Sequence, residues 1–218
     1  ISTHEVFDKI SELESWSPES INPKMVGRRE GWWGSSENFE SFMDELITWR
    51  ELGYHTCVRR ANYNQYSSLP EWAIKTLHEH SSDEREHIYS LDELTYSQTH
   101  DEIWNAAQNQ LRTQGVIQNY LRMLWGKKIL EWTPNPQIAL SYMITLNDRY
   151  SLDGRDPNSY SGVFWILGRY DRAWGPERSI FGKIRYMTSD STARKFNLKP
   201  YLEKWGNESL GVSTSISK

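Results

Sequence analysis

The sequence of 218 residues contains one cysteine and no long hydrophobic run. The lone Cys57 excludes an internal disulfide and a paired-cysteine zinc site, and it fits a reducing cytosolic or nuclear compartment. No stretch approaches the eighteen or so apolar residues that a membrane span needs, so we expect no membrane partner. The N-terminus, ISTHEVFDKI, lacks the basic start and apolar core of a signal peptide. An amphipathic pattern already runs at Val6 and Ile10, so we expect a chain that is truncated at its N-terminus.

Alternating, strand-like patterns are also nearly absent, whereas apolar residues recur at helical spacing. Long helices are expected over residues 38–54, 116–132 and 136–150. Shorter helices are expected over residues 4–12, 69–80, 91–95, 101–113, 162–167 and 191–195. The sequence therefore predicts one all-α domain over residues 1–205, with long irregular connections, and a flexible tail over residues 206–218.

Aromatic side chains are abundant, with eleven tryptophans and twelve tyrosines. This content suggests flat apolar walls for a flat ligand such as a flavin or a nucleobase. The net charge of −4 argues against a general nucleic-acid binder. Residues 169–204, however, hold nine Lys/Arg and four Asp/Glu, a net +5. A phosphate-facing surface and an ordinary solvated face both account for this local surplus.

Five motifs identify a family resemblance when their order and spacing are taken together. They are NYNQYSSLPEWA, THDEIWNAAQNQ, WGKKILEWTPNP, LNDRYSLDGRDPNSYSG and DRAWGPERSIFGKIRYM. Over roughly residues 1–205 they resemble the C-terminal, FAD-binding helical domain of class II cyclobutane-pyrimidine-dimer photolyases.

The resemblance implies a helical fold of the photolyase/cryptochrome type and an activity. Such enzymes flip a pyrimidine dimer out of UV-damaged DNA and split it with an electron from light-excited reduced FAD. The family's N-terminal α/β antenna domain and the loop that binds the FAD phosphates would lie upstream of this chain. The antenna chromophore is therefore unknown, and whether this chain alone binds FAD stays open.

The resemblance assigns flavin-binding roles to four polar residues. Arg122 and Asp153 match the family's ion pair beside the isoalloxazine ring. The residues support this pairing, because an arginine on a largely apolar helix face needs a carboxylate partner, although a purely structural pair has the same signature. Asn147 matches the amide at the flavin N5 edge, and Asn158 is a second candidate that a turn alone would explain.

Two tryptophans match the family's route for electrons during photoreduction. Trp125 would lie nearest the flavin and Trp104 farther out, together passing electrons from the surface. Trp132 lies seven residues after Trp125, on the same expected helical stripe, and its role is undecided. Outside this motif set, packing in the core would be the ordinary interpretation of such residues.

The dimer pocket is expected to combine a carboxyl group with apolar walls. Glu45 matches the family glutamate that hydrogen-bonds the thymine edge, and Trp49 lies one expected helical turn along. Trp165 would supply the other aromatic wall, and Met123 matches a pocket methionine. A glutamate with a tryptophan four residues later is also common on surface helices.

The basic C-terminal segment contains the expected DNA contacts. Arg172 and Trp174 match residues that enter the gap left by the extruded lesion. Lys183 and Arg185 would bind the flanking backbone or the lesion. A solvated loop is the alternative interpretation of the same residues.

Some positions depart from the family pattern. Gln118 and Asn119 stand where the family usually has His-Gly, and Arg169 lies in a segment that is one residue shorter than usual. These departures keep a second function class open, a non-repair flavoprotein photoreceptor or DNA-binding module of cryptochrome type. The presence of all three pocket residues, Glu45, Trp49 and Trp165, favours the enzyme.

A metal site is the third and least favoured hypothesis. It would use His78, His80 and His87, but histidines two residues apart on a helix point in different directions and no acidic third ligand is fixed. We therefore expect no metal. We also expect a monomer in the cytoplasm, associated with the nucleoid in a prokaryote or within the nucleus of a eukaryote.

Overall fold

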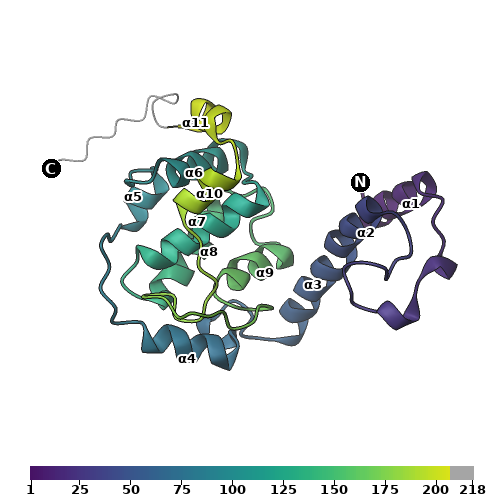
Figure 1. The fold of residues 1–218 in the computed structure, drawn as a ribbon, viewed down its shortest axis with the longest axis horizontal. Coiled ribbons are helices and arrows are strands. Elements are labelled where there is room, and N and C mark those ends of the chain that lie inside the picture. The colour runs from purple at the N-terminus through teal and green to yellow at the C-terminus, as the bar shows by residue number, and fades with distance from the viewer. Residues whose placement is uncertain (207–218) are drawn as a thin grey trace. The chain divides into compact units, whose positions relative to one another are not determined.

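The structure, a computed structural model, describes residues 1–206, which form eleven α-helices joined by turns and loops (Figure 1). Within these residues, strand-type pairing is confined to one isolated bridge between Arg178 and Gly182. The expected all-α class is confirmed. The chain divides into two compact units, Ile1–Ala61 and the part that begins at Asn62. The single domain expected over residues 1–205 stays a prediction, and the expected tail lies outside the described residues except for Gly206.

Membrane-spanning geometry is not found in the part of the chain that the structure describes, since each helix there is too short or too polar to cross a bilayer.

The first unit contains three α-helices and three shorter helical segments. These are α1 (Thr3–Leu13), η1 (Pro18–Ser20), η2 (Pro23–Met25), α2 (Glu37–Met43), η3 (Asp44–Trp49) and α3 (Arg50–Arg59). Ser2 starts α1 through a capping box with Glu5, and the Ser36 hydroxyl caps α2. Trp33, Phe39 and Met43 form the small buried core.

The sequence predicted one regular helix over residues 38–54, and this was wrong in its middle. The segment η3 is a π-helix, in which backbone bonds span five residues instead of four, between α2 and α3. The widened turn changes the helical register between Glu45 and Trp49. The Trp49 indole nitrogen donates to Asp44 Oδ2 at 2.9 Å, five residues back along the chain.

A buried carboxylate organises the loop before α2. Glu40, which is 4% exposed, accepts backbone N–H groups from Gly31, from Gly34 at 2.8 Å and from Ser35 at 3.4 Å. At Gly34, φ is +68° and a Cβ atom would lie 2.0 Å from the Ser20 carbonyl oxygen, so only glycine fits. This part of the glycine- and tryptophan-rich loop is therefore tied to α2 by one side chain.

The second unit contains the remaining α-helices and the short turn η4 (Tyr66–Ser68). The helices are α4 (Glu71–Glu79), α5 (Leu91–Thr95), α6 (Glu102–Gln114), α7 (Asn119–Glu131), α8 (Pro136–Tyr150), α9 (Pro157–Ile166), α10 (Ser189–Lys195) and α11 (Lys199–Trp205). The expected helices agree with these bounds within a few residues, apart from the start of α9, and α11 was not predicted.

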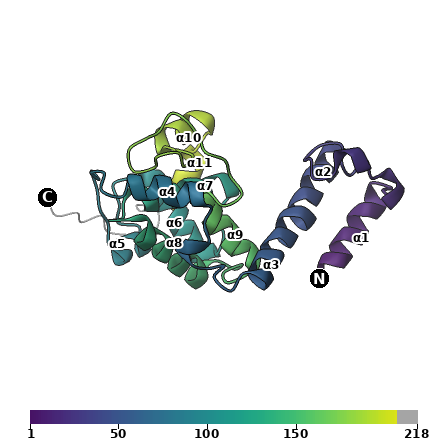
Figure 2. The same ribbon diagram turned by 90° about the horizontal axis from the view of Figure 1, so that it is seen from below.

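Four helices, α6 to α9, surround the main core of the second unit. Helix α7 packs on α6, α8 and α9, and both views show α6, α7 and α8 lying side by side (Figures 1 and 2). Helix α7 meets α9 at Gly126, where a Cβ atom would lie 2.1 Å from the Ile166 side chain. This close approach fixes α7, which carries Arg122 and Trp125, against α9.

Candidate functional site

The expected flavin pair forms between α7 and the loop after α8. Arg122 Nη1 lies 3.2 Å from Asp153 Oδ2, and both side chains are partly exposed. Burial opposes ionisation of Asp153, but the hydrogen bond from Ser151 and the charge of Arg122 outweigh it and hold the pKa of this carboxyl below its usual value. Because both side chains are only partly buried, a ligand can reach the ion pair. The pair also stabilises the loop after α8.

Asn147 lies beside this loop. Its side chain is buried, and Nδ2 donates a hydrogen bond to the Ser159 hydroxyl on α9. A Cβ atom at Gly154 would lie 2.9 Å from the Asn147 carbonyl oxygen, which shows that the loop with Asp153 packs against this end of α8. Asn158 is exposed in the first turn of α9, where its backbone N–H donates to Asp156 Oδ1 at 2.8 Å. The buried amide of Asn147 is therefore the better candidate for the flavin contact than that of Asn158.

Trp104 and Trp125, the two tryptophans of the expected electron route, are buried, as is Trp132, whose role the sequence left undecided, and Trp104 is 0% exposed. The Trp104 indole donates to the Trp125 carbonyl oxygen at 3.0 Å, and the Trp125 indole donates to Gln108 Oε1 at 2.8 Å. The rings of Trp104 and Trp132 meet edge to face, with centroids 5.7 Å apart. The Trp132 ring thus lies next to Trp104, whose own side chain is screened from solvent.

An aromatic cluster continues outward from Trp132. Its ring meets Tyr89 at 5.5 Å and His100 at 5.2 Å, and the Tyr89 hydroxyl lies 2.7 Å from His100 Nδ1. Burial and the neighbouring His87 lower the pKa of His100, which favours the neutral ring. Sequence analysis did not identify Tyr89, His100 or Gln108, because their spacing in the chain carries no signal for contact with a distant tryptophan.

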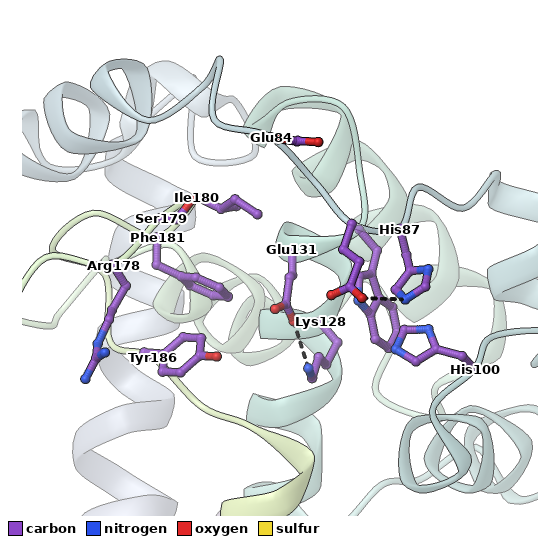
Figure 3. A pocket seen from close by; sticks show the side chains of 12 residues that line it. Glu84, His87, His100, Lys128, Glu131, Arg178, Ser179, Ile180, Phe181 and Tyr186 are labelled. Atoms are coloured by element: carbon purple, nitrogen blue, oxygen red, sulfur yellow. Dashed lines mark hydrogen bonds and ion pairs between the residues drawn. The ribbon is translucent and has the colours of Figure 1, made fainter.

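A cavity of about 430 Å³ opens beside this cluster. Figure 3 shows Arg178 and Tyr186 on one side and His87 and His100 on the other. Lys128, at the centre, is 2.8 Å from Glu131 Oε2. The cavity mixes acidic, basic and aromatic groups.

The histidines of the metal hypothesis belong to separate clusters. His80 Nδ1 pairs with Asp83 at 2.7 Å and His80 Nε2 with Glu177 at 3.5 Å, whereas the His87 ring packs on His100 with centroids 4.0 Å apart. Among the residues that the structure describes, no three His, Cys, Asp or Glu side chains gather as ligands for a metal.

The expected dimer-pocket residues lie in both units. Glu45 and Trp49 belong to η3 in the first unit, and Met123 and Trp165 belong to α7 and α9 in the second. Desolvation by the surrounding protein and the nearby Asp44 carboxylate raise the pKa of Glu45. A carboxyl group with a raised pKa holds its proton more readily and can then donate a hydrogen bond.

The structure brings the expected DNA contacts together around one indole ring. Two guanidinium groups lie close to the Trp174 ring, Arg172 at 4.5 Å and Arg185 at 5.1 Å from its centroid. Its indole nitrogen donates to Asp171 Oδ1 at 3.0 Å, and its backbone N–H donates to the Lys183 carbonyl at 2.9 Å. The Lys183 ammonium pairs with Glu177 at 3.1 Å, a partner that the sequence did not indicate.

The departures from the family pattern have structural roles. The Gln118 side chain caps α7 by accepting the Leu121 N–H at 3.2 Å. The Arg169 guanidinium lies over the Phe164 ring, 3.8 Å from its centroid, and donates to the Tyr63 carbonyl at 2.9 Å. These side chains therefore stabilise the fold around the site.

Comparison with known proteins bears on these residues. No family model matches the chain. Curated relatives named deoxyribodipyrimidine photo-lyase do match: the chain is 49% identical to the protein of Methanothermobacter thermautotrophicus over 163 residues, which are 75% of this chain and 36% of the relative. The chain is homologous to part of these photo-lyases. The photo-lyases of Arabidopsis thaliana and Oryza sativa are 46% and 45% identical over 169 residues, 77% of this chain and 34% and 33% of their own lengths.

The chain thus spans about a third of the length of the photo-lyases it matches. An identity of 45–49% shows that the matched segment shares its ancestry with these proteins. It does not by itself assign the activity of the longer proteins to this chain.

Proposed function

We propose that this chain is the helical catalytic part of a class II photolyase that repairs cyclobutane pyrimidine dimers in UV-damaged DNA with light. The observation that carries the proposal is the identity of 45–49% to four proteins named for splitting dipyrimidines. The cluster of Arg172, Trp174 and Arg185 supports it, because an aromatic side chain in contact with two cations suits a site beside phosphate groups.

The donor set of the second unit fits FAD. Arg122 and Asp153 offer a fixed charge pair of which both members reach solvent, and Asn147 holds a neutral amide in a buried position beside their loop. In the proposal, Arg122 and Asp153 face the isoalloxazine ring, and Asn147 contacts the N5 edge. When bound and reduced, FAD supplies the electron that light drives onto the dimer.

The tryptophans supply the electrons that keep such a cofactor reduced. In this proposal Trp125 lies nearest the flavin, Trp104 follows, and Trp132 carries the electron deficit outward. The ring contact of 5.7 Å between Trp104 and Trp132 and the complete burial of Trp104 support this order.

The remaining residues recognise the lesion. Glu45 donates or accepts a hydrogen bond at the thymine edge, and its raised pKa makes the protonated, donating form easier to reach. Met123 and Trp165 are apolar contacts for the lesion in the second unit, and Trp49 is one in the first. Because a dimer stacks poorly in the duplex, its extrusion costs less than that of a normal base pair, which gives selectivity for damage.

A light-sensing role of cryptochrome type, without repair, is the second candidate. The departures at Gln118, Asn119 and Arg169 favour it, because they lie in segments that carry site residues in the family. For either role we propose a monomer, which would act at the nucleoid or in the nucleus.

The test is an absorption spectrum of the purified chain with FAD, then blue light with a reductant, then incubation with an oligonucleotide that contains one thymine dimer. Bound flavin, photoreduction and loss of the dimer are the expected results. Bound flavin without repair would replace the enzyme with the light sensor. If the chain does not bind flavin at saturating FAD, the same spectrum is recorded for a chain extended at its N-terminus, and failure of that chain too would overturn the cofactor assignment.

Matched tryptophan variants sharpen the test. Trp125→Phe should abolish photoreduction while leaving repair intact when the flavin is reduced chemically beforehand. Trp205→Phe, a buried tryptophan on α11 outside the proposed route, should photoreduce like the wild-type chain.

A further inference from the structure

A lysine that the proposed repair mechanism does not use is completely buried in the second unit. Lys127 on α7 is 0% exposed, and its Nζ donates to the Ile166 carbonyl oxygen at 2.5 Å. Burying an ammonium group is costly unless the protein gains from its position, so lysine is rarely fully buried. The location of Lys127 therefore calls for a reason other than packing.

The carbonyl oxygen that Lys127 contacts belongs to the last residue of a helix. Ile166 is the last residue of α9, where the carbonyl groups carry the negative end of the helix dipole. The close contact between Gly126 and Ile166 fixes the distance between the two helices, so the Lys127 ammonium cannot move away without unpacking them. Lys127 thus anchors the point at which the chain leaves α9.

From the end of α9 the chain continues directly into residues 171–185, the segment that contains the proposed DNA contacts. A tight turn follows α9, with backbone bonds from Gly168 to the Trp165 carbonyl at 2.9 Å and from Arg169 to the Phe164 carbonyl at 3.0 Å. Asp171 comes five residues after Ile166 and accepts the Trp174 indole N–H.

Two charged members of that segment also act on Lys127. Burial lowers the pKa of Lys127 to about 7, the Asp171 carboxylate opposes this decrease, and the Arg185 guanidinium adds to it. Asp171 and Arg185 are the same groups that hold the Trp174 ring. The charge on Lys127 is therefore coupled to the geometry of the indole and its guanidinium partners.

We propose that Lys127 is a positioning residue whose protonation is linked to DNA binding by the segment from Asp171 to Arg185. This inference rests on the proposed function, because it takes DNA as the ligand of that segment. Phosphate groups next to Arg172 and Arg185 offset the cationic charge there and favour a proton on Lys127 Nζ. By linkage, protonation favours phosphate binding to the same extent. One proton passes from solvent to Nζ, and no covalent bond other than N–H forms.

Another titrating group lies in the same segment and has to be separated from Lys127. His80 pairs with Glu177, which also pairs with Lys183. This network contributes its own pH dependence. A variant at Lys127 leaves it in place, so the difference between variant and wild type isolates the lysine.

The experiment measures the affinity of the chain for a fluorescent duplex with one thymine dimer, by anisotropy between pH 6 and pH 8.5 at constant salt. The wild-type Kd should rise by roughly threefold to tenfold as pH increases through 7, which corresponds to a rise of about half to one unit in the lysine pKa on binding. Lys127→Met should reduce this change to the part that the His80 network contributes. Lys128→Met is the matched control, a neighbouring lysine paired with Glu131, and should keep it.

A second readout uses the wild-type chain, first without DNA and then with added duplex, and needs no variant that has to fold. In the wild-type chain, the indole N–H resonance of Trp174 should titrate with a midpoint near that of the Lys127 Cε resonance, and added duplex should raise that midpoint. If no duplex binds at any pH, the proposed function fails, and the indole titration still decides whether Lys127 acts on the segment. An indole resonance that ignores Lys127, or a Lys127→Met variant that binds more weakly at every pH with an unchanged pH dependence, would overturn the inference.

Discussion

The two units of the chain are stabilised by different kinds of contact. In the unit Ile1–Ala61, the buried hydrophobic core consists of Trp33, Phe39 and Met43, and α1 contributes no buried residue. In the unit that begins at Asn62, α6 to α9 enclose a large continuous core that includes three tryptophans. A small unit buries a smaller share of its surface, so the first has less hydrophobic stabilisation to draw on.

Hydrogen bonds offset part of the smaller hydrophobic stabilisation of the first unit. In the first unit, one carboxylate, Glu40, satisfies three backbone N–H groups of the loop before α2. In the second unit, polar side chains such as Gln108 and Asn147 are buried within an already packed core. The comparison teaches that the first unit depends on single polar groups, and the second on many apolar contacts.

Two methionines with equal burial offer a direct test, with the largest expected effect. Met143 in the second unit and Met43 in the first are both 0% exposed. Met143→Ala should lower the free energy of unfolding by roughly 2–5 kcal/mol, because the packed helices around it relax little into the cavity. Met43→Ala should lie at the low end of this range, since the small core can collapse more easily. Hydrogen exchange, resolved by residue, measures each loss.

The locations of the losses matter as much as their sizes. Met143→Ala should reduce amide protection in α6 to α9, and Met43→Ala in α2 and η3. Equal losses of protection in both units from either variant would show that the two parts unfold as one, which would contradict the comparison.

Sequence analysis located most helices because they satisfy local rules. Asn135 with Pro136 starts α8, the Asp101 side chain starts α6, and Gly115 ends α6 in a left-handed conformation. The π-helical turn of η3 was missed because apolar spacing at 38–54 fits a regular helix equally well. Helix α11, in which Trp205 is the one buried residue, was not predicted.

The candidate site shows the same division between local and distant information. Motif matching selected Arg122 with Asp153 and the group around Trp174, and the structure brings the members of each group together. Lys127 could not be singled out, because its partner Ile166 lies 39 residues away and contact across two helices leaves no trace in spacing. The proposed roles of these residues stay predictions until they are measured.

The dependence of the first unit on Glu40 predicts the next largest effect. Glu40→Ala leaves the Gly31 and Gly34 amides without their acceptor and should cost roughly 1.5–3 kcal/mol, the range for hydrogen bonds to a charged group. The amides of residues 31–35 should lose protection from hydrogen exchange first. Glu40→Gln keeps one acceptor oxygen and should cost less than the alanine variant. Equal losses for Gln and Ala would show that packing, not the carboxylate, holds the loop.

The smallest expected effect is a pH dependence that belongs to the second unit alone. The hydrogen bond and charge of Asp83, with a further contribution from Glu177, raise the pKa of His80 above its usual 6.5, although partial burial acts against them. A histidine whose pKa is higher in the folded state stabilises the fold fully below the unfolded pKa, and this contribution disappears as pH rises through the folded pKa. The free energy of unfolding of the wild-type chain should therefore exceed that of His80→Gln by more at pH 6 than at pH 8.5. Because His80 is close to solvent, we expect a difference below about 1 kcal/mol.

Urea titrations at the two pH values measure this difference, with His4→Gln on the exposed face of α1 as the control. An equal gap between wild type and His80→Gln at the two pH values would show that the bonds to Asp83 and Glu177 do not depend on a charged ring.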